Sequence, residues 1–286
     1  MKKRVLILCV VLFVVAYGAF IWERDHMDTS DHYINSLYKS DERIYYNELG
    51  EDDRAMYDLL IDSSLKHKTS ITIDMDKYHC VDYSDCGDII HYANDALSVD
   101  HPELMNYAGY SWHYNNGKFV LRLYPAYTLS YKDYYGVWKT EKILKEIEKD
   151  TEKMSDKEKI IYVYNWVGSH NDYDYYFTYT SKNQSIYNVF VKKNAVCAGF
   201  AKASQIIFQR IGIESYIVSG SSEDYHMWNI VKYEDRYYYY DSTVAVGFIE
   251  GTEHYYEGLK QEYMNYYVVT HPDWYPPVET TNMFEI

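Results

Sequence analysis

The chain has 286 residues, a length that suits one or two domains and can bury a sizeable core. Hydrophobic residues make up 47% of it and charged residues 25%, which is ordinary for a globular protein and excludes wholesale disorder. Lys and Arg number 28 against 43 Asp and Glu, for a formal net charge of −15. Because nucleic-acid-binding proteins carry a basic surface, we expect no nucleic-acid partner.

The chain begins with a basic segment followed by a long uncharged one. The first four residues include two lysines and an arginine, and residues 5–22 carry no charge. This pattern predicts a signal peptide or signal anchor at residues 1–24, with the rest of the chain outside the cytoplasm. The apolar run continues beyond the small residues Ala16 and Gly18, which favours an uncleaved anchor. We therefore expect a single-pass protein of the cell membrane, or a secreted protein if the segment is cleaved.

The four cysteines have different expected roles. Cys9 lies in the apolar segment, and Cys80 and Cys86 are six residues apart in the part expected outside the cytoplasm. An exported chain makes these two a candidate disulfide, and two free thiols are the alternative. A zinc site there would need two more ligands, and His79 is the one obvious candidate. Cys197 then remains without an expected partner, and its presence needs another explanation.

Residues 25–137 are predicted to form a small α+β region. Apolar residues recur there first with helical spacing and then in alternation, which is typical of strands. In chain order we expect a helix over residues 51–67, a strand over 71–75, a helix over 85–97, and a hairpin whose strands, 107–113 and 119–124, flank an Asn-Asn-Gly turn at 115–117.

Residues 138–286 are predicted to form a second domain, which carries the catalytic residues. Ser155 and Glu158 have the spacing of a capping box, so a helix is expected to follow Ser155. The expected elements are a helix from about residue 140, the helix after Ser155, a solvated loop at 171–174, a short helical turn at 185–190, a helix over 198–210 that Gly212 stops, a strand over 213–219, a hairpin of strands 225–233 and 236–243, and a proline-containing tail that packs as a loop. As the alternative to a solvated loop, Asp172 and Asp174 with Tyr173 and Tyr175 could line a cleft.

Cys197 stands at the expected start of the helix over residues 198–210. The positive end of a helix dipole favours the thiolate form of a cysteine, and the thiolate is the nucleophilic form. Gly199 is expected to keep the surface open near the sulfur. The alternative is that Cys197 is a small buried core residue, which is the usual place of a lone cysteine.

A thiolate nucleophile needs a base, and the base needs a group that orients it. With the hairpin turn at residues 234–235, His226 faces Thr243 and Asp241 faces Trp228. His226 and Asp241 are then diagonal neighbours on one face, about 7–8 Å apart at Cα, within reach of an imidazole and a carboxylate. A one-residue slip would place them on opposite faces. The register therefore predicts a Cys–His–Asp arrangement.

The segments around these three residues resemble the transglutaminase-like superfamily. That family has a Cys followed by a small or aromatic residue and Ala, then His-Ala-Trp-Asn, and then an aromatic residue before Asp-Ser or Asp-Thr. The matching segments here are 196–201 (Val-Cys-Ala-Gly-Phe-Ala), 212–213 (Gly-Ile), 226–229 (His-Met-Trp-Asn) and 239–243 (Tyr-Tyr-Asp-Ser-Thr). The resemblance covers about residues 140–250, and residues 40–135 resemble the leader of exported bacterial members, including its Asp-His-Pro-Glu-Leu segment at 100–104.

The resemblance implies an α+β, papain-like core: a helix bearing the Cys packs on an antiparallel sheet bearing the His and Asp. It implies Cys197 as nucleophile, His226 as general base and acid, and Asp241 as the orienting carboxylate. The family attacks an amide carbonyl, forms a thioester and passes the acyl group to an amine or to water. For this chain we expect no cofactor and no metal. Met227 departs from the pattern, as does Val244, where a Trp often follows. These departures make the substrate harder to infer and leave the triad intact.

Further site residues are less well defined by the sequence. The backbone N–H of Cys197 is a natural oxyanion donor, and Gln184, Tyr187 or Asn188 could supply a second. Family members often carry Tyr at the position of Tyr187, and packing under the helix is the alternative. Tyr187 and Trp228 are the candidate substrate-binding or oxyanion residues. Trp228 shares the face of His226, so it is expected to shield the pair from water, whereas Asn229 is expected to point to the other side.

Two functions follow as expectations. The first is an extracytoplasmic cysteine enzyme that acts on amide bonds of a peptide, protein or cell-wall substrate, with hydrolysis favoured over cross-linking. The second is an inactive transglutaminase-like module for surface binding or assembly, suggested by the acidic chain with its 37 tyrosines. A complete triad favours the enzyme, because a binding module does not need all three groups. The sequence leaves the oligomeric state undefined.

Overall fold

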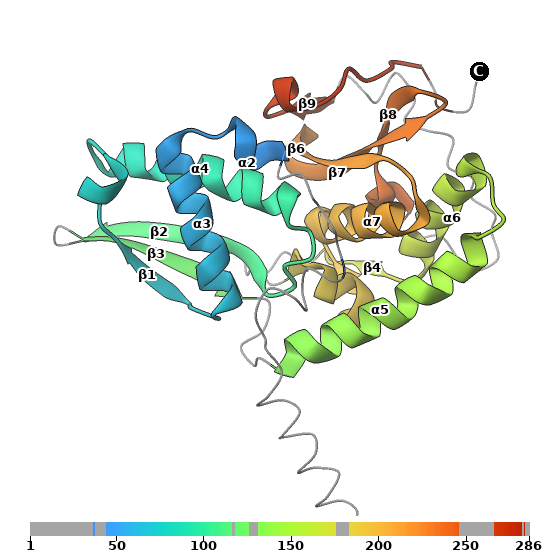
Figure 1. Cartoon of the computed structure of the whole chain (residues 1–286), viewed down its shortest axis with the longest axis horizontal. Helices are drawn as coiled ribbons and strands as arrows, with labels where there is room; N and C mark the ends of the chain where they lie inside the picture. Colours follow the sequence, from blue (N-terminus) through green and yellow to red (C-terminus); the bar gives the residue numbers. More distant parts are fainter. Residues whose placement is uncertain are drawn as a thin grey trace, which may run out of the picture.

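The computed structural model describes residues 37, 44–115, 118–125, 131–175, 183–222, 224–245, 266–281 and 283. The expected membrane segment at residues 1–24 and the turn residues 116–117 lie outside these ranges. Within them, none of the helices has the length and apolar character needed to cross a membrane. The fold combines helices with a three-stranded sheet, a two-stranded pair and a four-stranded sheet (Figure 1).

The N-terminal part is a three-stranded antiparallel sheet with helices on one face (Figure 1). Its strand order is β1–β3–β2, and Phe119 and Leu121 of β3 pack with Leu60 and Ile90 of the helices. The elements are α2 (Ile44–Glu48), α3 (Glu51–Leu65), β1 (Ser70–Ile73), the 3₁₀ turn η1 (Asp76–Tyr78), α4 (Tyr83–Asp100), β2 (Tyr107–Asn115) and β3 (Lys118–Pro125). The small α+β region expected from the sequence is therefore present, with a helix, a strand, a helix and a hairpin in the expected order.

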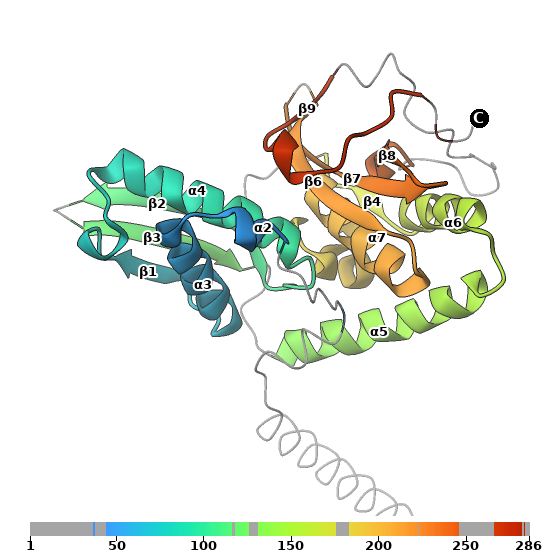
Figure 2. The same ribbon diagram turned by 45° about the horizontal axis from the view of Figure 1, so that its top comes forward.

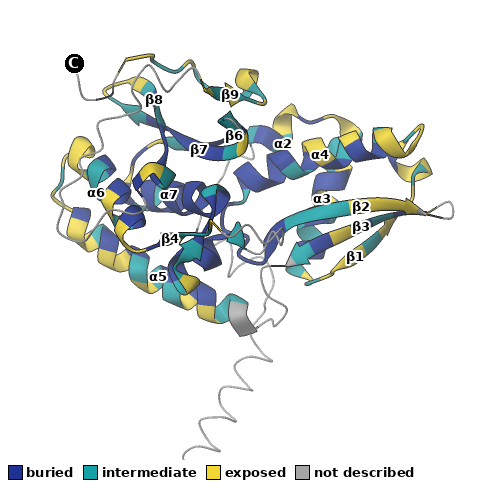
Figure 3. Ribbon diagram, turned by 180° about the vertical axis from the view of Figure 1, so that it is seen from behind, coloured by how far each residue is buried: buried dark blue, intermediate teal, exposed yellow. Residues whose placement is uncertain are grey.

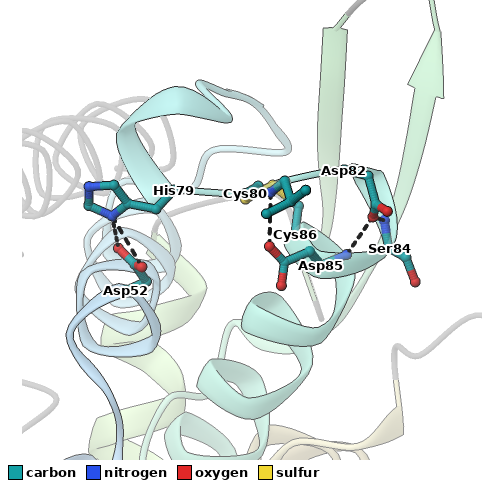
Figure 4. Close-up of a disulfide and its surroundings, with 8 residues drawn as sticks. Asp52, His79, Cys80, Asp82, Ser84, Asp85 and Cys86 are labelled. Carbon is teal, nitrogen blue, oxygen red and sulfur yellow. Dashed lines mark hydrogen bonds and ion pairs between the residues drawn. A yellow bond between two sulfur atoms is a disulfide. The ribbon is translucent and has the colours of Figure 1, made fainter.

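A disulfide joins Cys80 to Cys86 and closes the loop that leads into α4 (Figure 4). The same loop contains the cap of that helix, because the Asp82 carboxylate accepts the backbone N–H groups of Ser84 and Asp85 at 2.8 and 3.0 Å. An acceptor at this position satisfies N–H groups that have no partner inside the helix. The covalent closure and the cap thus hold the start of α4 together.

The C-terminal part places a central helix against a four-stranded antiparallel sheet. The sheet has the order β8–β7–β6–β9, and α7 packs on β7 and β6, with α5 and α6 on its other side (Figure 1). The elements are α5 (Tyr131–Thr151), α6 (Asp156–Ser169), β4 (Asp172–Tyr173), η3 (Asn188–Lys192), β5 (Asn194–Ala195), α7 (Cys197–Ile211), β6 (Ser215–Ser222), β7 (Asp224–Tyr233), β8 (Arg236–Tyr240), η4 (Ser242–Ala245), β9 (Tyr267–Val269) and η5 (Pro272–Trp274).

Local sequence signals explain where these elements begin and end. Ser155 and Glu158 form the expected capping box at the start of α6. Gly212 ends α7 in the left-handed region, with φ 80°. Glu234 and Asp235, at φ 47° and 61°, form the tight turn between β7 and β8.

Three elements differ from the sequence expectation. The helix α5 begins at Tyr131, about nine residues before the expected start. Asp172 and Tyr173 form a parallel pair with Asn194 and Ala195 instead of a solvated loop. The tail contributes β9, which pairs antiparallel with β6. The strands β4 and β5 have two residues each, and β6 and β9 are far apart in the chain. The local pattern of apolar residues therefore does not indicate either pairing.

The two parts of the chain share their hydrophobic interiors. Ala198 and Ala201 of α7 and Met227 of β7 belong to the same buried cluster as the N-terminal helices. Figure 3 shows many buried residues along α7 and β7 and along parts of α3 and α4. The helix α5 crosses the predicted boundary between residues 25–137 and 138–286, and the division into domains stays a prediction.

The C-terminal tail also links the two parts. After β9 it leads to η5 near α2 (Figure 2). The ring of Tyr45 in α2 lies 5.3 Å from the ring of Trp274 and 5.5 Å from that of Tyr275. The N-terminal part is thus held against the four-stranded sheet on two sides, by α7 and by the tail.

Candidate active site

Cys197 is the first residue of α7, and its side chain is half-buried. Among the described residues it is the one free cysteine. Val196 precedes it in extended conformation, and the Val196 N–H donates to the Asn183 carbonyl at 3.1 Å. The sulfur is therefore placed by a fixed turn at the positive end of a 15-residue helix.

Close packing, rather than openness, explains the glycine next to Cys197. Gly199 is buried, and a Cβ there would come within 2.9 Å of the Ala195 Cβ and 3.3 Å of the Asn183 and Ser185 carbonyl oxygens. The expectation that Gly199 keeps the surface open is wrong. Its small size lets β5 approach the first turn of α7.

His226 and Asp241 come together as the hairpin register predicts. The β7–β8 pairing runs from Tyr233 opposite Arg236 to Asn229 opposite Tyr240. His226 Nε2 lies 2.8 Å from Asp241 Oδ2. One detail differs, because β8 ends at Tyr240: Asp241 follows the strand, and Thr243 lies in the turn η4 instead of facing His226.

Three donors besides the imidazole surround the Asp241 carboxylate. Oδ1 accepts the Thr243 N–H at 2.9 Å and the Thr243 hydroxyl at 2.6 Å, and Oδ2 accepts the Tyr267 hydroxyl at 2.7 Å. Asp241 is 2% exposed, and burial by itself would raise its pKa. Hydrogen bonds from His226, Thr243 and Tyr267 outweigh that cost and hold the Asp241 pKa below its usual value. The carboxylate is therefore ionised at neutral pH.

The His226 imidazole bridges Asp241 and Cys197. Burial would lower its pKa, but hydrogen bonds and charge attraction from Asp241 and Cys197 raise the His226 pKa to about 10. Because Nε2 is bonded to Asp241, Nδ1 is the nitrogen that serves Cys197. A protonated imidazole between a carboxylate and a sulfur is the arrangement that stabilises a thiolate.

Aromatic rings enclose the histidine on its protein side. The Trp228 ring stacks on the His226 ring at 5.9 Å and 19°, and Trp228 is fully buried. Tyr267 meets the Trp228 ring edge-on at 5.0 Å. Trp228 therefore lies on the His226 face as expected, where it excludes water from the pair.

Asn229 points to the opposite side of β7, also as expected. Its side-chain amide donates to the Ala201 carbonyl of α7 at 3.1 Å. This bond joins the strand that carries His226 to the helix that carries Cys197. Asn229 is therefore a link between the two elements and not a lining residue.

Tyr187 lies in the hydrophobic core beside α5. Its ring stands 2.9 Å from the position that a Cβ of Gly136 would take. Of the two roles that the sequence suggests for Tyr187, its position supports packing in the core. Gln184, another of the oxyanion candidates, lines a pocket next to the start of α7.

Sequence reasoning missed Tyr267 and favoured a solvated loop for Tyr173, yet both lie at the site. Tyr173 interacts with Cys197, and its burial raises the Tyr173 pKa. Tyr267, on β9, bonds Asp241. The alternation of Tyr173 and Tyr175, and the aromatic and β-branched run at residues 266–270, are strand-like signals that could have indicated both. Which strand each would join was not readable from the sequence.

The described residues contain no cluster of three or more His, Cys, Asp or Glu side chains arranged to hold a metal ion.

The arrangement of Cys197, His226 and Asp241 supports attack by the Cys197 sulfur on an acyl carbon. The Cys197 N–H, which faces the Tyr173 hydroxyl, is placed to donate to an oxyanion.

The central part of the chain matches a known protein family. Residues 142–242 match the model of the transglutaminase-like superfamily. This span contains Cys197, His226 and Asp241. No curated protein sequence matches the chain.

Solved structures resemble the chain at low identity. A TGase shares 19% identity with a TM-score of 0.34, covering 52% of this chain and 46% of that chain. A candidate cysteine protease from Cytophaga hutchinsonii shares 14% identity with a TM-score of 0.32, covering 48% of this chain and 62% of its own. The chain thus spans about half the length of these structures.

Proposed function

We propose that the transglutaminase-like domain at residues 142–242 is the core of a cysteine enzyme that acts on amide bonds. Cys197 is the nucleophile, His226 the general acid and base, and Asp241 the carboxylate that orients the imidazole. The observation that carries the proposal is the hydrogen bond between His226 Nε2 and Asp241 Oδ2 at 2.8 Å, on an imidazole that also interacts with Cys197. Burying the two charged groups, the His226 imidazolium and the Asp241 carboxylate, costs free energy. A surface-binding module has no need to keep such a pair.

The reaction proceeds in two halves. The Cys197 thiolate attacks the amide carbonyl carbon, and the Cys197 N–H stabilises the developing oxyanion. The carbon–nitrogen bond then breaks as the His226 imidazolium gives its proton to the leaving amine, which leaves a thioester on Cys197. In the second half His226 takes a proton from water, the resulting hydroxide attacks the thioester, and Cys197 departs as thiolate with a carboxylic acid as product.

Water is the proposed acceptor, and the substrate is a peptide or cell-surface material outside the cytoplasm. The basic and then apolar N-terminal sequence supports export. The Cys80–Cys86 disulfide supports an oxidising compartment. Anchoring through residues 1–24 and the choice of hydrolysis over transfer to an amine belong to the same proposal.

The alternative is a binding module with an unused triad. The exposed rings of Tyr83, Trp112 and Tyr114 favour it, because they cluster on the N-terminal part at 5.9–6.2 Å between centroids. Exposed aromatic clusters of this kind are typical of interaction surfaces. The cluster lies by the disulfide loop and not at the triad, so it is also compatible with an enzyme.

The test compares Cys197 alkylation in the full chain, with Cys9 changed to Ser, against the same protein carrying His226→Ala. Fast reaction with iodoacetamide at pH 6 that disappears in the variant is the expected result, because a free thiol ionises near pH 8.5. Equal rates in both proteins would mean that the triad is inactive. Hydroxylamine trapping of acyl groups from a peptide panel, with Cys197→Ala as control, then measures turnover.

A further inference from the structure

A pocket of about 370 Å³ opens between the two parts of the chain, next to the nucleophile. One wall comes from α4 and the sheet of the N-terminal part, and it includes His91 and Asp95. The other wall comes from the catalytic elements and includes Ala198, Lys202 and Tyr225, which neighbour Cys197 or His226 on α7 and β7. The N-terminal part therefore supplies half of a cavity that begins one residue from Cys197.

Lys202 brings a positive charge into this pocket. It lies on α7 five residues after Cys197 and is 5% exposed. No described carboxylate stands within 4.0 Å of its ammonium, the distance of an ion pair. Burial lowers the Lys202 pKa to about 8, and the charges of Glu103 and Cys197 act in the opposite direction. The amine is thus mostly protonated at pH 7.

Each of the two nearby carboxylates lies against a histidine. Glu103 Oε1 lies 2.6 Å from His101 Nδ1, and its Oε2 is buried without a hydrogen-bond partner. Asp95, on the α4 wall, has Oδ2 3.6 Å from His91 Nε2 and 3.8 Å from His271 Nε2. Neither forms an ion pair with Lys202. The Lys202 ammonium thus has no ion-pair partner within 4.0 Å among the described residues, and an anion bound in the pocket would offset the cost of holding a charge there.

We propose that this pocket receives a free carboxylate of the substrate on the Lys202 ammonium, so that the enzyme selects amides that carry a carboxylate close to the reacting carbonyl. This inference rests on the proposed function of Cys197. The substrate class is a peptide with an acidic residue or a free carboxyl terminus next to the scissile amide. Asp95 and His91 then face the more distant part of that peptide, where a polar or cationic group fits.

Two alkylating reagents of the same size test the charge preference without knowledge of the substrate. N-iodoacetylglycine carries a carboxylate where N-iodoacetylglycinamide carries a neutral amide. In the full chain with Cys9→Ser, we expect Cys197 to react about tenfold faster with the carboxylate reagent, the ratio that a charge-assisted hydrogen bond provides. In Lys202→Met the ratio of the two rates falls to near one; this ratio, and not the absolute rate with either reagent, is the readout.

The controls separate this inference from the proposed function. Lys145→Met removes an exposed lysine of α5 outside the pocket and leaves the ratio unchanged. A ratio that survives in Lys202→Met would assign the preference to the His226 imidazolium and overturn the inference. Slow reaction with both reagents in the unmodified protein, unaffected by His226→Ala, would instead overturn the proposed function.

A second measurement covers the case in which Lys202→Met does not fold. N-acetylglycine and N-acetylglycinamide are compared for protection of the unmodified Cys197 against iodoacetamide. Protection by the carboxylate compound at a concentration where the amide compound gives none supports the inference. Equal protection by both, or none by either up to the highest soluble concentration, contradicts it.

Discussion

The Tyr267 hydroxyl donates to Asp241 Oδ2 at 2.7 Å, and that same oxygen lies 2.8 Å from His226 Nε2. Tyr267 comes from β9, the last strand of the sheet, 26 residues after Asp241 in the chain. The carboxylate that orients the imidazole is therefore itself positioned by the C-terminal tail. A segment expected to pack as a loop completes the active site.

Replacement of Tyr267 tests this relationship. Tyr267→Phe keeps the ring against Trp228 but removes the donor to Asp241, and hydrogen bonds to charged groups contribute about 1.5–3 kcal/mol. We expect Cys197 alkylation at pH 6 to slow by roughly tenfold, with less effect at pH 9 where a free thiol ionises unaided. Tyr266→Phe changes the exposed neighbour and serves as the control. A uniform loss at both pH values would indicate a structural role instead.

The pH dependence follows from the raised His226 pKa of about 10. A histidine with a raised folded pKa gives stability that is complete below its unfolded value, near 6.5, and is lost as pH rises through the folded value. We expect wild type to lose stability relative to His226→Ala between about pH 6.5 and 10, measured by denaturant unfolding. Acyl transfer falls as the pH rises through about 10, because the leaving amine needs the imidazolium proton. A difference between the proteins that is constant across this range would contradict the prediction.

Tyr173 is expected to affect the oxyanion more than the thiolate. Its hydroxyl interacts with both the thiol and the backbone N–H of Cys197. Tyr173→Phe should leave alkylation of Cys197 at pH 6 within about threefold of wild type and slow acyl transfer by roughly tenfold, the effect of losing a group that orders an oxyanion donor. Tyr175→Phe, which alters the exposed neighbouring ring, is the matched control. An equal loss in both assays would assign Tyr173 to the thiolate.

Gly220 allows β9 to approach β6 behind the histidine. It pairs with His226 and Val269, and a Cβ there would overlap the Val268 carbonyl oxygen and come within 2.8 Å of Trp228. Gly220→Ala should therefore displace β9, with a loss of about 1–3 kcal/mol in the free energy of unfolding and loss of the Tyr267 contact. Ser221→Ala, one residue along the strand, is the control for urea unfolding and alkylation. Normal behaviour of Gly220→Ala would argue against the β6–β9 pairing.

The disulfide is expected to affect stability alone. Closing the short loop between Cys80 and Cys86 contributes about 2 kcal/mol in the chain-entropy model. The double variant with Ser at both positions should lose about that much stability to denaturant. Its Cys197 alkylation rate should stay the same, because the disulfide loop and the triad lie in different parts of the chain (Figures 1 and 4). A change in that rate would reveal coupling between the loop and the site.

Several features could be predicted from the sequence because they depend on near neighbours in the chain. Ser155 caps the start of α6 and Gly212 ends α7, and each lies within a few residues of the helix end that it determines. The β7–β8 register follows from one two-residue turn at 234–235, so the meeting of His226 and Asp241 was predictable. The Cys197 position at the start of α7 follows from the helical pattern after it.

Other site features depend on pairings between distant segments. Tyr173 reaches Cys197 because β4 pairs with β5, and Tyr267 reaches Asp241 because β9 pairs with β6. Two or three residues of strand carry almost no periodic signal, and nothing local specifies their partners. The sequence therefore could not place either hydroxyl at the site.

The sequence by itself determined that Cys197 stands at the start of a helix and that His226 meets Asp241, because these residues lie on elements whose ends and register are set by local turn and cap chemistry. The tertiary structure decided what surrounds these three residues. The N-terminal part packs on α7 and β7, and in doing so it closes the pocket that contains Lys202. The sequence shows only that Lys202 lies on α7, whereas its burial results from the packing of the two parts. Which faces of these parts meet is decided by the shape and apolar area of many residues that are distant in the chain.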